Sequence, residues 1–448
     1  MINNRIPSSF RDPSSFVFCL ENKIFRSIQP NYKTTFNYLI ESGLYNELTE
    51  KNYLIKHTFI RIDKDENQII QPEHIPFISY PYEWSFEQIK DAALLTLKIQ
   101  NIALRYNMSL KDASIYNVQF LNGKPIFIDS TSFEFNNDKP WTAYYQFCKH
   151  FLYPLWIMKY VSPELNSLYL SNLDGIDPKF TIQLMPIRAY FRLSIILHLL
   201  TPVFYRTNSE KSGSKLFSKE QHKRLLKHLF SIISSLHLPY KKSSWNQYYD
   251  NRITNAKYLE SKEFLVKNIM SRLSAGIVLD LGANDGHFSR FVEQSSLILS
   301  TDFDSRVVNE NYIKTKSEKN ANLLPLVLNI CNPSPSIGWN NSERTGFFDR
   351  IEFDTVMALA LIHHLVFSNN ITLEMIAQKL LIAKNHLIIE FIPINDEKVK
   401  QITIDKKIDH IQYSENLFES SFEKYFDLKE KHKINGSERI LYWYEKKA

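Results

Sequence analysis

Asp280, Gly282, Asn284 and Gly286 alternate within seven residues, and this spacing gives the chain its clearest candidate for binding chemistry. A short apolar run precedes Asp280, and a helix-like segment follows from His287. We interpret the stretch as a buried strand, a tight turn and the first turn of a helix. Because glycine lets backbone N–H groups approach a ligand without a side chain in the way, the turn is a candidate binding loop.

Two familiar phosphate-binding loops do not fit this stretch. The dinucleotide fingerprint needs G-x-G-x-x-G, and a P-loop needs a Gly-Lys-Ser/Thr sequence that is missing here. The observed pattern is D-x-G-x-N-x-G, with Asn284 in the middle position. Asn is the residue other than glycine that best tolerates positive φ, so we expect the backbone shape to survive at Asn284.

The elements that must position this loop alternate between strands and helices. Asp302 ends a second apolar strand, 22 residues after Asp280, and an acid there can accept the two hydroxyls of a ribose. The alternation predicts a mainly parallel sheet, and a final hairpin around Asn435-Gly436 predicts an antiparallel pair at its edge. The expected strands after the loop are 297–301, 323–328, 353–360, 386–391, 426–431 and 439–444.

From roughly residue 245 to the C-terminus, the loop and strand series resembles the class I S-adenosylmethionine-dependent methyltransferases. Further stretches resemble a long bacterial subgroup of them: Asn332–Pro335 with Gly338-Trp339, Glu343-Arg344 and Ala358–Leu365. The resemblance implies a Rossmann-like, seven-stranded α/β sheet and S-adenosyl-L-methionine as the cofactor. It also implies these cofactor-binding residues: Asp280, Gly282, Ala283, Asn284, Asp285, Gly286, Asp302, Phe303, Asn329, Ile330 and Ala358. The family usually has Asp where Asn329 stands, but an amide oxygen can still accept from the adenine amino group.

The same resemblance supplies candidates for the methyl acceptor side. His363 and His364 follow the fourth strand, where one of them could act as general base; alternatively, one caps the next helix and the other packs on the sheet. Trp339, Glu343 and Arg344 are expected to line the acceptor pocket, with Arg344 able to clamp a carboxylate or phosphate. The expected acceptor is a small molecule or carbohydrate. No Asn-Pro-Pro-Tyr follows the fourth strand, which argues against methylation of a flipped base.

The first half of the chain carries a second constellation. Asp112 and Asn117 form an Asp-x4-Asn loop, Asn122-Gly123 predicts a hairpin, and Asp129 follows it. This resembles the catalytic segment of protein-kinase-like and aminoglycoside-kinase-like folds, in which the loop Asp accepts a proton and the Asn and second Asp hold Mg²⁺. If this half binds Mg²⁺, Asn117 and Asp129 are the candidate ligands; otherwise they are turn residues.

The kinase-like resemblance has gaps. Gly43 is the only glycine before position 123, so no glycine-rich phosphate cover exists. No motif identifies a phosphate-binding lysine, and Lys23 and Arg26 are the candidates that we name. We expect residues 75–84 to form a hinge strand and 86–106 the main helix. The alternative function is therefore a nucleotide- or metabolite-binding kinase-like module with a regulatory or vestigial methyltransferase domain.

Length and charge bound the remaining possibilities. The 448 residues predict an α+β kinase-like domain over 1–140, a mostly helical region over 141–244 and the methyltransferase domain over 245–448. Nine Lys or Arg and two acids lie between Arg206 and Lys242, within a chain of net charge +6. This basic segment indicates a solvated helix and linker, or a face for an acidic acceptor, a membrane surface or nucleic acid; without an accompanying aromatic pattern, nucleic acid is disfavoured.

Three scattered cysteines indicate neither a disulfide framework nor a zinc site. The N-terminus is too polar for a secretory signal, and the most apolar long window, 184–204, contains Arg188, Arg192 and His198. The sequence therefore predicts a cytoplasmic protein without a membrane span.

Overall fold

The computed structural model describes residues 5–206, 216–239, 256–273, 276–293, 295–404 and 412–447. The chain forms two compact units. The first comprises Met1–Pro239 together with Pro335–Thr345, and the second comprises Tyr240–Ser334 and Gly346–Ala448. The first unit thus includes a short segment of eleven residues, Pro335–Thr345, that is inserted in the sequence of the second unit between β11 (Leu323–Val327) and β12 (Phe353–Ala358).

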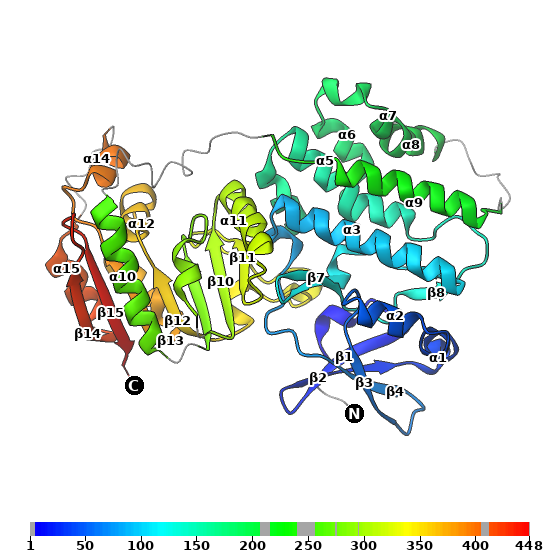
Figure 1. Ribbon diagram of the computed structural model, residues 1–448, viewed down its shortest axis with the longest axis horizontal. Helices are drawn as coiled ribbons and strands as arrows, with labels where there is room; N and C mark the ends of the chain where they lie inside the picture. The colour runs from blue at the N-terminus through cyan, green and yellow to red at the C-terminus, as the bar shows by residue number, and fades with distance from the viewer. Residues whose placement is uncertain are drawn as a thin grey trace. The chain divides into compact units, whose positions relative to one another are not determined.

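The second unit is built on one seven-stranded sheet with the order β11-β10-β9-β12-β13-β15-β14 (Figure 1). Its strands are β9 (Ile277–Leu281), β10 (Leu297–Asp302), β11 (Leu323–Val327), β12 (Phe353–Ala358), β13 (Ala383–Phe391), β14 (Phe426–Lys433) and β15 (Ile440–Lys446). The first five strands are parallel to their neighbours, whereas β15 is antiparallel to both β13 and β14. The expected parallel sheet with an antiparallel closing pair is confirmed.

Helices connect these strands. They are α10 (Ala256–Arg272), α11 (Ser305–Glu318), α12 (Ile362–Asn369), α13 (Leu373–Lys379), α14 (Glu397–Thr403) and α15 (Glu415–Phe422), with the short 3₁₀ helix η10 (Phe288–Phe291) after β9.

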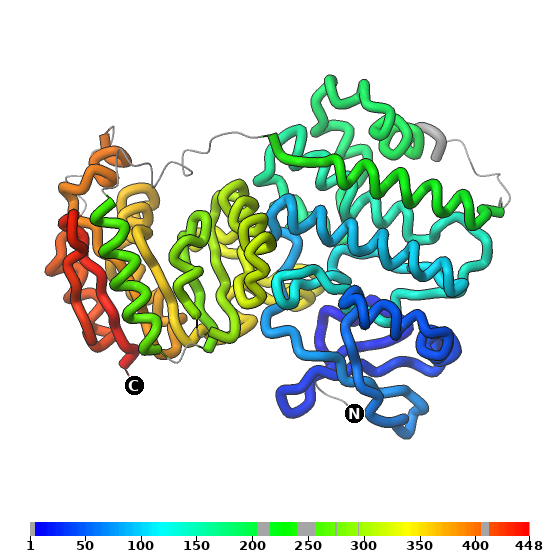
Figure 2. Tube along the Cα trace, viewed as in Figure 1, coloured from blue at the N-terminus to red at the C-terminus, as the bar shows by residue number. Residues whose placement is uncertain are grey.

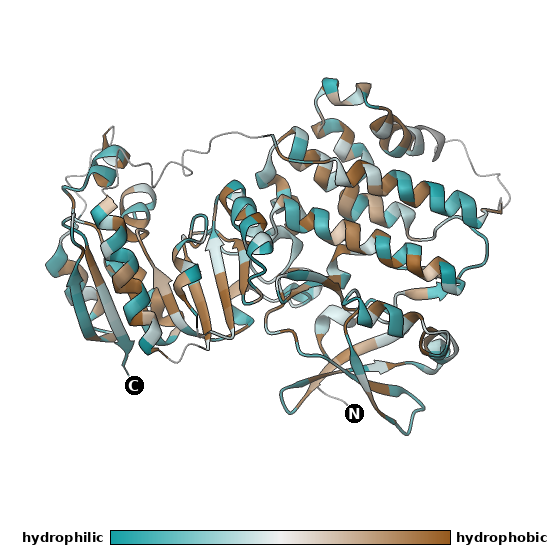
Figure 3. Cartoon of the chain, viewed as in Figure 1, coloured by the Kyte–Doolittle hydropathy of each residue, from teal (hydrophilic) through white to brown (hydrophobic). Residues whose placement is uncertain are grey.

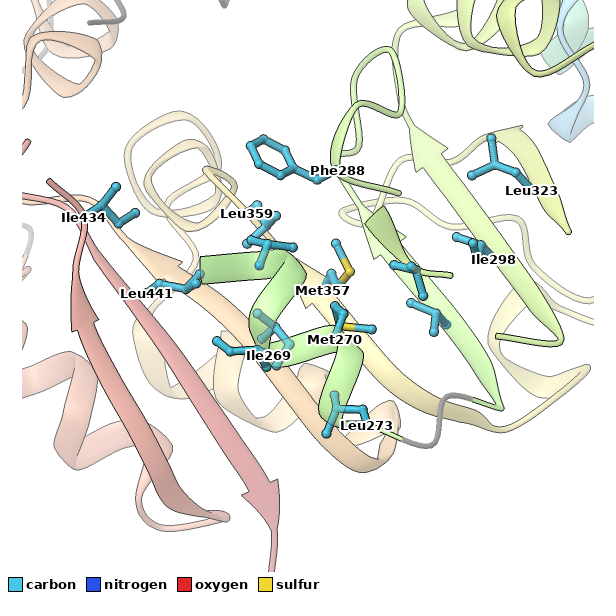
Figure 4. Close-up of a cluster of buried hydrophobic side chains, with 14 of the residues drawn as sticks. Ile269, Met270, Leu273, Phe288, Ile298, Leu323, Met357, Leu359, Ile434 and Leu441 are labelled. Carbon is cyan, nitrogen blue, oxygen red and sulfur yellow. The ribbon is translucent and has the colours of Figure 1, made fainter. Parts of the chain in front are cut away.

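The core of this unit forms because its central strands consist mostly of hydrophobic residues, brown in Figure 3, and are buried on both faces. Ile269 and Met270 of α10 pack in one buried cluster with Val278, Ile298 and Met357 from three neighbouring strands (Figure 4). Burying a side chain of this size contributes roughly 1.5–3 kcal/mol. The cluster therefore fixes the strands whose carboxyl ends carry the predicted site.

The first unit begins with a four-stranded antiparallel sheet of order β1-β2-β4-β3, which is followed by two strand pairs, β5-β8 and β6-β7. Asn122 and Gly123 both have positive φ, at 51° and 71°, in the turn of the predicted hairpin β6–β7. The strands are β1 (Ser15–Leu20), β2 (Lys23–Ile28), β3 (His57–Ile62), β4 (Gln68–Pro72), β5 (Met108–Leu110), β6 (Val118–Leu121), β7 (Lys124–Phe127) and β8 (Phe133–Phe135).

Helices make up the rest of the first unit. The α-helices are α1 (Lys33–Glu41), α2 (Leu44–Glu50), α3 (Phe86–Ala103), α4 (Tyr144–Phe147), α5 (Tyr153–Tyr160), α6 (Pro178–Leu184), α7 (Leu193–Ile195), α8 (Thr201–Arg206) and α9 (Lys219–Ser234). Short 3₁₀ and π segments join them, among them η3 (Pro81–Glu83), η4 (Leu104–Tyr106), η8 (Ile187–Phe191) and η9 (Ile196–Leu200). Helices α3 and α9 lie side by side (Figures 1 and 2).

Several expectations for this unit can be compared directly with the structure. The main helix is confirmed as α3 with η4. The spacing of Ser218 and Gln221 predicts a capping box, which is present at the start of α9. The hinge strand expected at 75–84 is wrong, because these residues form no strand and Pro81 instead starts η3. Residues 208–214, whose Gly and Ser content predicts a flexible point, lie outside the described residues.

Within the described ranges, no helix is long and apolar enough to cross a membrane. The same residues contain no group of three or more His, Cys, Asp or Glu side chains suited to hold a metal ion.

Candidate cofactor site

The loop after β9, which contains Gly282 and Gly286, adopts the left-handed backbone that its sequence predicts. Gly282, Asn284 and Gly286 have φ values of 69°, 53° and 73°. A Cβ at Gly286 would lie 2.4 Å from the Asn311 side-chain nitrogen, and one at Gly282 would lie 3.1 Å from Leu361 Cδ1. The loop thus needs glycine both for conformation and for space, while Asn284 meets only the conformational need.

Four amides of this loop donate to acceptors within the protein. The N–H of Ala283 donates to Thr301 O at 2.9 Å, and that of Gly286 donates to Ala283 O at 2.9 Å. The N–H of Asn284 donates to Asp302 Oδ2 at 2.9 Å, and that of Asp285 to Asn284 Oδ1 at 2.8 Å. These four amides hold the loop in shape, and the role of the loop in binding a ligand stays a prediction.

Asp280 lies buried at the carboxyl end of β9, with 1% of its surface exposed. Its Oδ2 accepts a hydrogen bond of 2.6 Å from Ser289 Oγ. Burial and, to a smaller extent, the nearby charge of Asp302 raise the pKa of this carboxyl to about 6, against the opposing effects of the Ser289 hydrogen bond and the Lys262 charge. An acid that is so costly to ionise marks a candidate functional position.

Asp302 occupies the matching place on the next strand. Strands β9 and β10 are paired in parallel, with Thr301 opposite Leu281, so both acids lie at the same edge of the sheet. Asp302 accepts the Asn284 amide on Oδ2 and the Asp304 amide on Oδ1, at 2.9 and 3.0 Å. Burial also raises the pKa of Asp302 to about 6. The structure therefore brings together the two carboxylates and the loop between them.

The end of β12 completes this edge. Ala358 is fully buried, and Ala360 just beyond it has a positive φ of 52°. The turn at Ala360 brings the Leu361 side chain next to Gly282. Leu361 is also the N-cap residue of α12. Ala358 is thus on the strand that adjoins β9, as its predicted role requires.

Four other predicted cofactor residues surround this core at different depths. Phe303 follows Asp302 and is 50% exposed. Asp285 accepts the His287 amide at 3.3 Å. Asn329 is exposed and its Oδ1 accepts the Cys331 amide at 2.9 Å, while Ile330 is half-buried beside it after β11. Their contacts with a cofactor stay predictions.

The two histidines differ in burial. His363 is fully buried in α12, and neither of its ring nitrogens has a hydrogen-bond partner. Burial, together with the charges of nearby Arg439, Lys262 and Lys398, lowers the pKa of His363 well below its usual value, so its imidazole is neutral. His364 is half-buried, and the two ring centroids are 4.1 Å apart. Their catalytic roles stay predictions.

A buried polar network that the sequence analysis missed borders the site. Lys262 Nζ of α10 lies 2.6 Å from Glu390 Oε2 of β13, and both side chains are fully buried. Tyr258 donates to Glu390 Oε1 at 2.8 Å, and Arg439 pairs with Asp396 through two bonds of 2.8 and 3.0 Å. The signal available in the sequence was an acid, Glu390, inside the otherwise apolar strand 386–391.

A pocket of about 600 Å³ opens beside this network. The residues that line it come from the start of α10, the segment after β13 and the β14–β15 turn; they include Tyr258, Asp396, Lys398, Gly436 and Arg439. It lies at the carboxyl end of β13, on the same edge as the candidate cofactor residues.

The residues expected to line an acceptor pocket belong to the first unit. Glu343 is 3% exposed, and its Oε1 lies 3.1 Å from Arg11 Nε. The Arg344 guanidinium lies 4.4 Å from the centre of the Tyr116 ring, and Trp339 lies 6.4 Å from Phe10 between ring centroids. These three side chains pack among residues of the Asp-x4-Asn loop and the N-terminal segment, so their predicted role in the acceptor pocket stays untested.

The acids of the first unit are held by protein groups. Arg26 pairs with Asp129, which also accepts from the Thr131 and Ser132 hydroxyls at 2.7 Å each. Burial would raise the pKa of Asp129, but the Arg26 charge and these hydrogen bonds lower it. Asn117 Nδ2 donates to Ser132 Oγ at 3.0 Å. Of the two candidate phosphate-binding cations, Arg26 is thus engaged with the predicted metal ligand.

The sheet order and the acidic strand ends define a Rossmann-like α/β unit of the type predicted for class I methyltransferases. No family model matches the chain. In an alignment of 462 positions, the chain is 31% identical to nodulation protein NoeA of Rhizobium meliloti (strain 1021). The alignment covers 99% of this chain and 96% of that protein. The chain therefore belongs to the same family as nodulation protein NoeA.

Two solved structures are each similar to a little less than half of the chain. Magnesium protoporphyrin IX methyltransferase from Synechocystis PCC 6803 is 14% identical and covers 45% of this chain and 89% of its own, with a TM-score of 0.31. The N-methyltransferase NodS from Bradyrhizobium japonicum WM9 is 10% identical and covers 46% and 97%, with a TM-score of 0.34.

Proposed function

We propose that the second unit is an S-adenosylmethionine-dependent methyltransferase domain that acts on a small-molecule or carbohydrate acceptor. The observation that carries this proposal is the pair of buried acids, Asp280 and Asp302, at adjoining ends of parallel strands with a left-handed loop between them. Ligands of open α/β sheets bind at this edge, outside the carboxyl ends of the strands.

The carboxylate oxygens of Asp302 are suited to accept hydrogen bonds from the ribose hydroxyls of such a cofactor. A carboxylate offers about four acceptor positions; Asp302 accepts the amides of Asn284 and Asp304 and also interacts with the Phe303 amide. We infer that the acceptor capacity that remains on its two oxygens takes the ribose hydroxyls. Because the pKa of Asp302 is about 6, the side chain is ionised at neutral pH, when its hydrogen bonds to hydroxyls are strongest.

When bound, S-adenosylmethionine supplies an activated methyl group, which leaves alignment and exclusion of water to the protein. Gly282 keeps a side chain out of the space beside Leu361 at the start of α12, and Gly286 leaves room for the Asn311 and Arg290 side chains. We infer that His364, the less buried histidine, accepts the proton when the acceptor is a hydroxyl. NoeA is named a nodulation protein, which states no reaction, so the reaction proposed for this chain rests on its site.

We infer that the first unit recognises the acceptor and does not transfer phosphate. Its kinase-like topology stays a prediction. Arg26 covers Asp129, so a metal ion would have to displace a guanidinium from a buried carboxylate. The alternative function, a nucleotide-binding kinase-like module, is therefore less well supported by the site.

Calorimetry with S-adenosylhomocysteine on the full chain tests the proposal. The intact protein should bind, and Asp302→Asn should weaken binding by about 100-fold, because two charge-assisted hydrogen bonds at about 1.5–3 kcal/mol each become weaker neutral ones. Asp427→Asn, at an exposed position in β14, is the matched control and should bind normally. No heat from the intact protein, together with stabilisation by ATP and Mg²⁺, would favour the alternative.

A further inference from the structure

An acid-free stretch lies in the helical part of the first unit. The sequence contains no Asp or Glu between Asp177 and Glu210, while Lys179, Arg188, Arg192 and Arg206 fall inside that interval. In the rest of the chain acids nearly balance bases, with 48 Asp and Glu against 50 Lys and Arg. The stretch therefore carries a purely positive charge.

Large apolar side chains in the same stretch lie on the surface. Phe191 is 84% exposed, Ile187 78% and Leu193 67%. Ile196 and Leu197 follow at 39% and 44%. We call these five residues the apolar patch. Single exposed apolar residues are common, but five within eleven positions form a cluster that marks an interaction site.

The local backbone explains why these side chains are left outside. The segment consists of a 3₁₀ helix, one turn of α-helix and a π-helical turn. Ala189, Ile195 and Leu199 point into the unit and are buried, which leaves the remaining apolar residues on the outer side. Figure 3 shows this hydrophobic colouring around α7.

Cations surround the apolar patch. Arg188 and Arg192 are exposed between its residues, and the Arg192 guanidinium lies 5.8 Å from the centre of the Tyr160 ring. The His198 ring of η9 stacks on His228 of α9 at 5.1 Å. Arg224 is exposed on α9 one helical turn before His228. On these neighbouring elements the acids Glu87 and Glu220 are each paired with a lysine.

We propose that the apolar patch and its flanking arginines form a docking surface for an anionic lipid bilayer. Apolar side chains on one face with Arg beside them, and no acid, are the composition that inserts into the headgroup region while the cations bind lipid phosphates. A second copy of the chain is a poorer occupant, because its patch would bring arginine against arginine. Nucleic acid would use the cations but would leave the aliphatic side chains unexplained.

Co-sedimentation of the full chain with vesicles tests this assignment. Vesicles of phosphatidylglycerol and phosphatidylcholine in equal parts should bind the protein, and pure phosphatidylcholine should bind it less. Ile187→Ser/Phe191→Ser should lower the partition coefficient by at least about tenfold. Arg188→Gln should lower it by roughly fivefold, the contribution of one cation near an anionic surface.

Matched controls come from another exposed region of the same unit. Phe59→Ser/Ile62→Ser removes two apolar side chains that are 55% and 51% exposed on β3, and Arg61→Gln removes a cation there. Both should leave vesicle binding unchanged. Since all substituted side chains are exposed, thermal unfolding should be unchanged too; a variant that unfolds early is replaced by Phe191→Ser alone.

Three results would overturn the assignment. The intact protein could fail to sediment with vesicles of either composition. It could bind them equally well after the Ile187/Phe191 change. Alternatively, the same change could abolish self-association or duplex DNA binding in a protein that ignores vesicles, which would assign the patch to that other partner.

Discussion

Replacing Asp280 by Asn should stabilise the protein at neutral pH while weakening its binding site. The carboxyl of Asp280 is buried, and burial is the main cause that raises its pKa from 3.8 to about 6. The native state therefore holds the proton more tightly than the unfolded chain does. The stability from this protonated group is present in full below pH 3.8 and is lost as the pH rises to about 6.

The magnitude follows from that difference in pKa. At 1.36 kcal/mol per pH unit, ionised Asp280 costs the native state about 3 kcal/mol above pH 6 and about 1 kcal/mol at pH 4.5. The Asn side chain avoids this cost, and its oxygen can still accept the hydrogen bond from Ser289 Oγ. The variant should thus gain about 1 kcal/mol at pH 4.5 and about 3 kcal/mol at pH 7.5.

Scanning calorimetry at the two pH values measures this difference. For a unit of this size, 3 kcal/mol corresponds to a rise in Tm of roughly 6–12 °C at pH 7.5. Asp427→Asn, which changes an exposed acid, should shift Tm by less than about 1 °C at either pH. An Asp280→Asn protein that melts earlier than wild type at pH 7.5, or whose gain does not grow with pH, would refute the reasoning.

Further predictions concern the loop, the histidines and the buried network. Gly286→Ala should destabilise the loop by about 1–3 kcal/mol, whereas Asn284→Gly should be nearly neutral; urea unfolding compares them. His364→Ala should cut methyl transfer to a hydroxyl acceptor while leaving cofactor affinity intact, and unchanged turnover would remove it from the mechanism. Lys262→Met should cost about 3 kcal/mol, because buried Glu390 then keeps only the Tyr258 hydroxyl and the Arg439 guanidinium 3.6 Å away; a free energy of unfolding that falls by less than about 1 kcal/mol would show that the pair contributes little.

The sheet of the second unit could be predicted from sequence because its signals are local. Each central strand is a short apolar run between helical segments, and the final hairpin carries Asn435-Gly436. The left-handed conformation of Asn284 was also predictable, since it depends on the residue type and the spacing of its neighbours.

Contacts between distant segments could not be predicted in the same way. The loop amides bond to Thr301 and Asp302, 18 residues beyond them, so their direction depends on how β10 packs. The strand expected at 75–84 does not form; Pro81, which cannot donate to a ladder, starts a 3₁₀ turn there instead. Burial of Glu343 beside Arg11 joins residues 332 positions apart, which no local pattern reports.

The site itself was only partly visible from sequence. Asp280 and Asp302 were identified because acids at the ends of apolar strands are conspicuous. The network of Lys262, Glu390 and Arg439 was missed, since its members come from three separate elements and become a group only when α10, β13 and β15 assemble.

The most direct measurement of the central claim is a crystal structure of the chain with S-adenosylhomocysteine. The account predicts the ribose hydroxyls within hydrogen-bond distance of the two Asp302 oxygens, with the nucleoside beside Gly282 and Gly286. A nucleoside bound away from Asp302, or none bound at saturating concentration, would contradict it.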